Sequence, residues 1–197
     1  MLAIGGLTPF TTIDYPGKLA AVLFCQGCPW RCGYCHNRHL LTCGQPGTVP
    51  WGDVLRFLEQ RHGLLDAVVF SGGEPTMQHG LRSALAEVRH MGFSTGLHTA
   101  GPFPERLHSC LPYLDWVGMD IKASFDEYHL ITAMPGSGDA ARQSAELLCR
   151  SGVPHQFRTT LDPFLLNGGR IETMRQRVRE KWGEELIVQP CQVHART

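Results

Sequence analysis

Four cysteines fall within eleven residues near the start of the chain, and they constrain the protein more than any other feature. They are Cys25, Cys28, Cys32 and Cys35, and they follow the short apolar run 20–24. The N-terminus has no basic stretch ahead of an apolar core, so we expect no secretion signal. In a reducing compartment such a cluster indicates metal binding more often than disulfides.

The spacing of the last three cysteines suits an iron-sulfur cluster. Cys28, Cys32 and Cys35 have the pattern C-x3-C-x2-C, which can hold three irons of a cubane and leave the fourth iron open to a ligand. A four-cysteine zinc site that includes Cys25 is the alternative, but a gap of three residues between its pairs is very short. We expect Cys25 to end a strand as a small buried residue. Four further cysteines are scattered and are read as ordinary thiols: Cys43, Cys110, Cys149 and Cys191.

Short apolar runs alternate along the chain with amphipathic segments. Helical spacing of apolar residues predicts helices around 51–58, 77–91, 141–148 and 171–182. Strands are predicted at 20–24, 66–70, 95–99, 116–121, 156–161 and 186–188. Repeated strand–helix units predict an α/β fold with a mostly parallel sheet. Six strands are too few for an eight-stranded barrel, so a doubly wound sheet and an open partial barrel both remain.

Polar residues follow several of these strands, where parallel α/β folds place their sites. Gly72 and Gly73 follow the second predicted strand, and a glycine pair there lets the backbone approach a ligand closely. Asp120 and Lys122 end the fourth strand on the same side. Each pattern alone is weak, because a tight turn and an exposed ion pair would look the same.

Together these residues resemble the radical SAM superfamily, whose signature is C-x3-C-x-aromatic-C after the first strand. The resemblance covers nearly the whole chain and implies one domain, residues 1–197, folded as a partial (βα)6 open barrel. It also implies a 4Fe-4S cluster on Cys28, Cys32 and Cys35. For S-adenosyl-L-methionine (SAM), it implies contacts from Tyr34, His36, Gly72, Gly73, Glu74, Thr99, Asp120, Lys122 and Arg158.

Further stretches resemble one family within this superfamily. The segment Gly6–Lys18, the run Gln26-Gly27-Cys28 and the ending Cys35-His36-Asn37 are similar to activating proteins of anaerobic ribonucleoside-triphosphate reductases. Pyruvate formate-lyase activating enzyme is a close relative of these. The resemblance implies that SAM is cleaved reductively and that a glycyl radical is formed on a partner enzyme. A small-molecule radical SAM enzyme, such as a 7-carboxy-7-deazaguanine synthase, and a metal-binding redox module without SAM chemistry are the alternatives.

The chain departs from the related activating enzymes after the third predicted strand. His98 stands where an Asp occurs in those that hold a monovalent cation beside SAM, and Ala100 stands where they have Asn. A neutral imidazole is a poor ligand for an alkali ion, which puts that cation site in question here. Near the C-terminus, Gln189 and His194 are candidates for a further SAM contact.

Charge and hydropathy limit the partners. Acidic and basic residues balance at 18 each, so no nucleic-acid partner is expected. The longest apolar run, 19–25, is too short to cross a membrane. We therefore expect a cytoplasmic enzyme. By resemblance, its partners are a glycyl radical enzyme and a flavodoxin or ferredoxin as electron donor.

Overall fold

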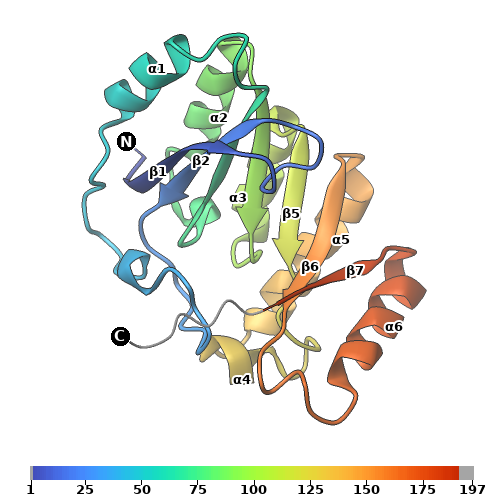
Figure 1. Cartoon of the computed structure of the whole chain (residues 1–197). Coiled ribbons are helices and arrows are strands. Elements are labelled where there is room, and N and C mark those ends of the chain that lie inside the picture. The colour runs from blue at the N-terminus through green and yellow to red at the C-terminus, as the bar shows by residue number, and fades with distance from the viewer. Residues whose placement is uncertain (1, 191–197) are drawn as a thin grey trace.

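The computed structural model describes residues 2–190 and is built on one seven-stranded sheet (Figure 1). The strands pair in chain order, so each is hydrogen-bonded to the next. Six of them are parallel, and the first is antiparallel to the second. They are β1 (Ile4–Thr11), β2 (Ala20–Cys25), β3 (Ala67–Gly72), β4 (Ser94–Thr99), β5 (Trp116–Asp120), β6 (His155–Thr160) and β7 (Leu186–Gln189).

This strand order decides between the two predicted architectures. A doubly wound sheet reverses its order at a switch point, whereas here the order runs from β1 to β7 without reversal and the sheet does not close. The predicted partial open barrel is therefore confirmed. The six predicted strands are all present, within one or two residues of the expected bounds.

The four predicted helices are also present, with one shifted boundary. Met77 lies in a separate 3-10 turn, η2 (Pro75–Met77), so α2 begins only at Leu81. The four helices are α1 (Trp51–Glu59), α2 (Leu81–His90), α5 (Ser137–Ser151) and α6 (Arg170–Trp182). The short elements α3 (Pro104–Cys110), α4 (Tyr128–Thr132), η1 (Arg38–Leu40) and η3 (Leu111–Tyr113) were not predicted. No helix within residues 2–190 is long and apolar enough to span a membrane.

The sheet is buried on both faces, which explains its continuous apolar runs. Alternate side chains such as Leu23, Phe70 and Leu97 lie on the outer face of the sheet and pack against the helices in the larger core. The intervening side chains, such as Val22 and Val69, face a smaller cluster on the concave side. The larger core is thus a single apolar layer between the sheet and the helices that cover its outer face.

A loop fills the part of the concave side that lies near the amino ends of the parallel strands. Residues 12–19 connect β1 to β2, and Tyr15 of this loop joins the smaller cluster. Its ring lies 5.2 Å from that of Trp116, measured between ring centres. Gly96 permits the contact, because a Cβ there would lie 3.0 Å from the Tyr15 ring. We call residues 12–19 the plug loop.

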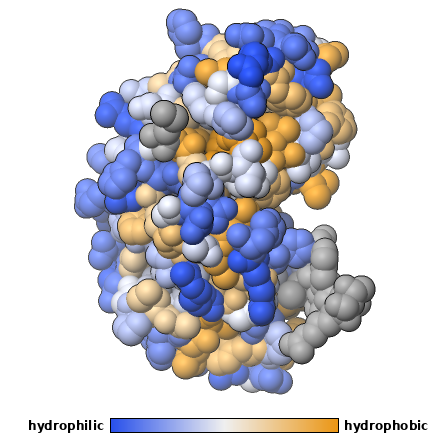
Figure 2. Space-filling view, turned by 90° about the vertical axis from the view of Figure 1, so that its left-hand side faces the viewer, coloured by the Kyte–Doolittle hydropathy of each residue, from blue (hydrophilic) through white to orange (hydrophobic). Residues whose placement is uncertain are grey.

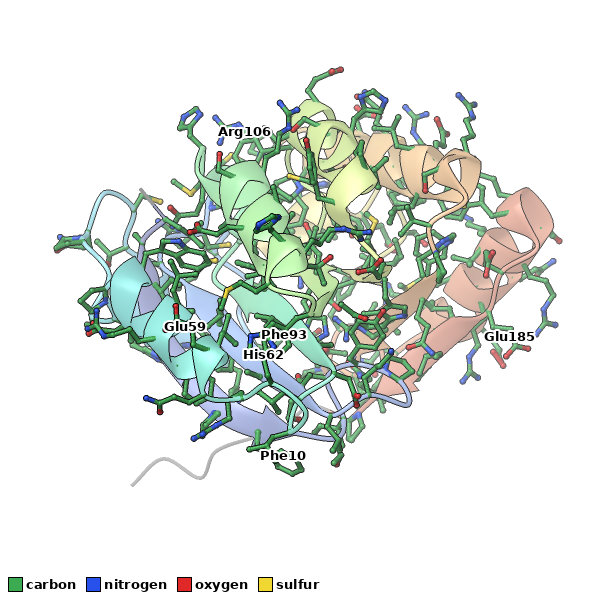
Figure 3. The ribbon with its side chains drawn as sticks, turned by 90° about the horizontal axis from the view of Figure 1, so that it is seen from above. Phe10, Glu59, His62, Phe93, Arg106 and Glu185 are labelled. Atoms are coloured by element: carbon green, nitrogen blue, oxygen red, sulfur yellow. The ribbon has the colours of Figure 1, made fainter. Side chains whose placement is uncertain are left out.

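β1 was not predicted, and it forms one free edge of the sheet. Its sequence includes two glycines and a proline, and its pairing with β2 is irregular at two places, so no clear strand pattern appears. Phe10 of β1 and Glu185, which precedes β7, mark separate parts of the perimeter seen from above (Figure 3). On the side where β1 lies, the surface is hollowed, and apolar side chains are exposed among hydrophilic ones (Figure 2).

We predict that the plug loop contributes to stability through one buried ring. Tyr15 is 7% exposed, so Tyr15→Ala should lower the free energy of unfolding by about 3 kcal/mol, because it leaves a cavity against Trp116. Urea unfolding of the metal-free protein measures this. Ile13→Ala is the matched control in the same loop: Ile13 is 86% exposed, and its loss should change stability by less than about 0.5 kcal/mol. Equal effects of the two substitutions would contradict the packing role of Tyr15.

Candidate functional site

A cavity of about 490 Å³ opens at the carboxyl ends of the parallel strands. Pockets of this size suit a small-molecule cofactor. It brings together residues from the ends of all six parallel strands, β2 to β7, as the parallel topology requires. Ten of the twelve predicted site residues line it: Cys28, Cys32, Cys35, Tyr34, His36, Gly72, Gly73, Thr99, Asp120 and Lys122.

The cysteine loop, residues 26–37, forms one wall of this cavity. Its backbone is tied at several points: the Gly27 amide donates to the Leu40 carbonyl at 2.7 Å, and the Arg31 amide donates to Thr132 at 2.9 Å. Within residues 2–190, no three His, Cys, Asp or Glu side chains converge on a single metal-ion position. The thiols of Cys28, Cys32 and Cys35 all line the cavity, and a multinuclear cluster is the kind of group whose separate metals such thiols can reach.

Burial keeps the thiols of Cys28 and Cys32 protonated in the metal-free protein. It raises the pKa of Cys28 to about 12, with a further contribution from Glu74. It also raises the pKa of Cys32, although Lys122 opposes the shift. Because metal binds thiolate, filling the site must release these protons.

Cys25 occupies a different environment. Its side chain is fully buried in the helix-side core and does not line the cavity. The prediction that it ends a strand as a small buried residue is confirmed. Among the described residues, Cys25 thus stands apart from the three thiols that line the cavity.

Gly72 and Gly73 lie directly against the start of the cysteine loop. The Gly73 amide donates to the Cys25 carbonyl at 2.9 Å. Gly72 has φ +107°, and a Cβ on it would lie 2.5 Å from the Cys25 nitrogen. A Cβ on Gly73 would collide with the Gly27 carbonyl. Only glycine fits at either position, and both line the cavity.

Glu74 lies behind the cavity wall rather than in it. Its carboxylate is buried and accepts hydrogen bonds from the Thr76 amide and hydroxyl, from the Thr99 hydroxyl at 2.7 Å and from the Ala100 amide at 2.9 Å. Burial raises its pKa, and these hydrogen bonds oppose the rise. The bonds from Thr76 order the loop that follows β3, and those from Thr99 and Ala100 join it to the end of β4, so the geometry supports an ordering role. A direct contact between Glu74 and SAM stays a prediction.

Three charged side chains meet at the end of β5. Asp120 lies 3.5 Å from Lys122 Nζ and 3.2 Å from Arg158 Nη2. Burial alone would raise the pKa of Asp120, but Arg158 and Lys122 hold it below its usual value. Burial alone would lower the pKa of Lys122, but Tyr34, Asp120 and Cys32 raise it well above the usual range. The carboxylate and the ammonium are therefore both charged at neutral pH.

Arg158 does not line the cavity, because its guanidinium is held on the concave side behind Asp120. It also donates to the Gly118 carbonyl at 3.4 Å and lies 5.9 Å from the centre of the Trp116 ring. A Cβ on Gly118 would lie 2.7 Å from the guanidinium carbon, so glycine at that position makes room for it. Arg158 orients Asp120, and its predicted contact with SAM remains untested.

Tyr34 supplies a buried polar atom without a partner. Its hydroxyl makes no hydrogen bond of normal geometry within residues 2–190, and Lys122 Nζ lies 5.5 Å from the ring centre. Burial raises its pKa to about 12, against the effect of Lys122. A buried unpaired hydroxyl costs about 1–3 kcal/mol. Three thiols, a glycine cradle, a buried ammonium and this unpaired hydroxyl therefore fit a cavity that holds a metal cluster and a zwitterionic ligand.

Asp14 and His98, which line the floor of the cavity, were not predicted as a pair. The Asp14 carbonyl of the plug loop lies 2.8 Å from His98 Nε2, and Ser71 Oγ lies 3.3 Å from His98 Nδ1. Burial and the adjacent Arg158 lower the pKa of His98 to about 4, so the ring is neutral. The shorter contact, to the carbonyl, favours the proton on Nε2 with Nδ1 accepting from Ser71; Arg158 Nη1, which lies 3.2 Å from Nε2, then makes no hydrogen bond to it. The departure from Asp at this position, noted in the sequence, thus builds a contact that supports the cavity floor.

The candidate residues near the C-terminus and the scattered cysteines lie in different places. Gln189 lines the cavity together with Pro190, whereas His194 and Cys191 lie outside the described residues. The thiol of Cys43 is exposed and lies 3.4 Å from the Cys28 carbonyl. Cys110 is buried and Cys149 is partly buried. Asn37 and Ser71 line the cavity as well and carried no sequence signal beyond their position beside the motifs.

Comparison with known proteins agrees with this site. The model of the Radical SAM superfamily matches residues 22–178. A protein of Methanocaldococcus jannaschii named as a glycyl-radical enzyme activating enzyme is 30% identical over 90% of this chain and 75% of its own length. The pyruvate formate-lyase-activating enzyme of Clostridium pasteurianum is 32% identical over 89% of this chain and 76% of its own.

Solved structures agree in fold. SuiB of Streptococcus suis, bound to S-adenosylmethionine, superposes with a TM-score of 0.66 and 15% identity over 86% of this chain but only 40% of SuiB. QueE of Escherichia coli superposes with a TM-score of 0.55 and 17% identity over 95% of this chain and 93% of QueE. The chain belongs to the radical SAM superfamily and, within it, to the family of glycyl-radical-enzyme activating enzymes. Its cofactors are accordingly a 4Fe-4S cluster and SAM.

We predict that neutral His98 makes stability depend on pH. Its pKa is about 4 in the folded chain, below the usual value near 6.5, so the unfolded chain binds a proton first as pH falls. The stabilisation is therefore complete above about pH 6.5 and is lost toward pH 4, by up to about 3 kcal/mol. Urea unfolding of the metal-free protein across this range measures it. His98→Gln should flatten the profile, whereas His39→Gln, on an exposed ring, should not; equal profiles for wild type and His98→Gln would contradict the assignment.

Proposed function

We propose that this enzyme cleaves SAM reductively and generates a glycyl radical on an anaerobic ribonucleoside-triphosphate reductase. The observation that carries the proposal is that one cavity is lined by three thiols, by the glycine pair Gly72–Gly73 and by the buried ammonium of Lys122. The named relatives support activation of a glycyl radical enzyme. The segment Gly6–Lys18 favours the reductase as partner, by resemblance.

In this proposal, each wall of the cavity has one task. Cys28, Cys32 and Cys35 would hold a 4Fe-4S cluster. When bound, the cluster and SAM together supply one-electron cleavage to methionine and a 5′-deoxyadenosyl radical, which removes hydrogen from a glycine Cα. The remaining task of the chain is to bind and orient SAM and to exclude water from it.

The SAM contacts divide between backbone and side chains. In this proposal the backbone carbonyls of Gly72 and Gly73 accept hydrogen bonds from the methionyl ammonium, and Lys122 binds the carboxylate. Tyr34 lies beside Lys122 and offers its ring and unpaired hydroxyl to the nucleoside. His36 and Thr99 complete the lining. Glu74 and Arg158 hold these groups in place from behind.

Electron supply and location follow from the same chemistry. We assign the electron to a flavodoxin or ferredoxin and the reaction to the cytoplasm. Seven cysteines within residues 2–190 are free thiols, and a reducing compartment preserves them. A small-molecule radical SAM enzyme would share the fold, and an assay of the glycyl radical separates it from this proposal.

The proposal predicts that Cys32 is essential for the cluster while Cys25 is not. After anaerobic reconstitution, Cys32→Ala should lose most bound iron and sulfide and all 5′-deoxyadenosine formation under dithionite, because a thiolate ligand is missing. Cys25→Ala, in the core, should retain both. Loss of the cluster in Cys25→Ala with a folded chain would overturn the ligand assignment. A glycyl radical on the reductase, detected by electron paramagnetic resonance, tests the partner.

A second prediction concerns Lys122. Lys122→Met keeps the stem of the side chain and leaves Asp120 paired with Arg158, so the fold should persist. SAM binding should weaken about tenfold to a hundredfold, because a charge-assisted hydrogen bond is lost. Equilibrium dialysis of the reconstituted protein measures the affinity. Lys181→Met, on the exposed side of α6, is the matched control, and unchanged affinity in Lys122→Met would return Lys122 to a structural role.

A further inference from the structure

The sequence around the cysteine loop carries only positive charge. No Asp or Glu occurs between Asp14 and Asp53, although the whole chain has equal numbers of acidic and basic residues. Within this stretch, Arg31 and Arg38 belong to the cysteine loop and to η1, which follows it. Both side chains are exposed. We call this pair the loop arginines.

The backbone of the cysteine loop holds the loop arginines in place. Arg31 Nη1 donates to the Cys28 carbonyl at 2.6 Å and to the Trp30 carbonyl at 2.9 Å. Arg38 Nη2 donates to the Gly33 carbonyl at 2.7 Å. Neither guanidinium forms a salt bridge with a described carboxylate, whereas Arg142, Arg170, Arg175 and Arg177 on the helices do. The loop thus presents two fixed cations whose charge is not neutralised.

The loop arginines lie outside the cavity. The cavity lining includes Cys28, Trp30 and Cys32 but neither arginine, so the side chains leave the loop on its other side. One side of the loop therefore carries the cysteine thiols. The other side carries two guanidinium groups, which are held by backbone carbonyls of the same loop. A protein bound to the arginines would approach the thiols without entering the cavity.

We propose that the loop arginines are the docking surface for an acidic one-electron carrier protein. This inference rests on the proposed function, since a carrier is needed only if the cluster is reduced. The carrier gives up one electron and the cluster gains it; no proton moves and no bond forms or breaks. Electron transfer rates fall steeply with distance, so a docking surface on the backbone of the ligand loop shortens the path.

The positions of the two faces favour a carrier over the glycyl radical partner. The partner must bring its glycine into the cavity, whose mouth the loop arginines do not line. A carrier needs only to come close to the cysteines. Fixed positive charge also attracts an acidic surface over a distance and speeds encounter, in a way that salt screens.

The first test is binding, and it does not require a loaded enzyme. We expect an acidic flavodoxin to bind the metal-free protein, measured by fluorescence anisotropy of labelled flavodoxin, and the affinity to fall as salt rises. The double variant Arg31→Glu/Arg38→Glu should weaken binding at least about tenfold and abolish the salt dependence. Arg150→Glu is the matched control, because Arg150 is an exposed arginine at the C-terminal end of α5, which leads into the amino end of β6, whereas the cysteine loop follows the carboxyl end of β2. Equal losses in the control and the double variant would overturn the proposal.

The second test is reduction of the reconstituted protein. Reduced flavodoxin should reduce the double variant at least about tenfold more slowly than wild type, whereas dithionite should reduce both alike and support equal 5′-deoxyadenosine formation. Arg31→Lys/Arg38→Lys should recover most of the rate, since it restores charge. If the charge reversal disturbs the loop, bound iron falls, and Arg38→Glu alone, which loses a single backbone contact, carries the test.

These outcomes separate the docking surface from the proposed function. Absence of 5′-deoxyadenosine with dithionite in wild type would refute the proposed function. Normal cleavage with dithionite together with an unchanged rate from flavodoxin in the double variant would refute the docking surface alone. A double variant that reduces normally but fails to form the glycyl radical would assign the loop arginines to the partner enzyme instead.

Discussion

The position of the cysteine loop depends on a backbone contact that only glycine permits. The Gly73 amide donates to the Cys25 carbonyl, and the Glu74 amide donates to the Gly27 carbonyl at 2.8 Å. The Glu74 carboxylate then binds Thr99 and Ala100 at the end of the next strand. The ends of β2, β3 and β4 are thereby held in one network, and any side chain at Gly72 or Gly73 would push them apart. Each hydrogen bond contributes only about 1 kcal/mol, so the contact matters more for geometry than for stability.

The charges beside this network do not balance. Asp120 carries one negative charge, and Lys122 and Arg158 carry two positive charges. His98 is neutral, and burial keeps the thiol of Cys32 protonated while the site is empty of metal. An uncompensated buried cation is unfavourable, so this corner of the cavity gains stability from an anionic ligand. A carboxylate meets that requirement, in agreement with the role proposed for Lys122.

The sequence was sufficient for the parts of the structure that follow regular patterns. Buried parallel strands appear as apolar runs, and the C-x3-C-x2-C spacing identifies the loop that ends the first of them. Local pattern could not show where Arg158 points, because its partners Asp120 and Gly118 are distant in sequence and adjacent only through strand pairing. For the same reason, the contact of His98 with the plug loop spans 84 positions and has no local signature. The irregular strand β1 was missed since its glycines and proline weaken the alternation.

The open barrel and the plug loop together set the depth of the cavity. In a closed barrel, layers of side chains fill the interior. Here one layer, which includes Tyr15 and Trp116, fills only the part of the concave side near the amino ends of the parallel strands. The contact between Asp14 and His98 forms the boundary between this layer and the cavity. The space above it is about 490 Å³, which is suitable for a cofactor but leaves little room for a folded substrate. A macromolecular substrate must therefore extend a short segment into the mouth. The loop arginines lie outside that mouth. With the carrier docked there as proposed, electron entry and substrate entry would use different faces of the same cysteine loop, and neither partner would have to leave before the other binds.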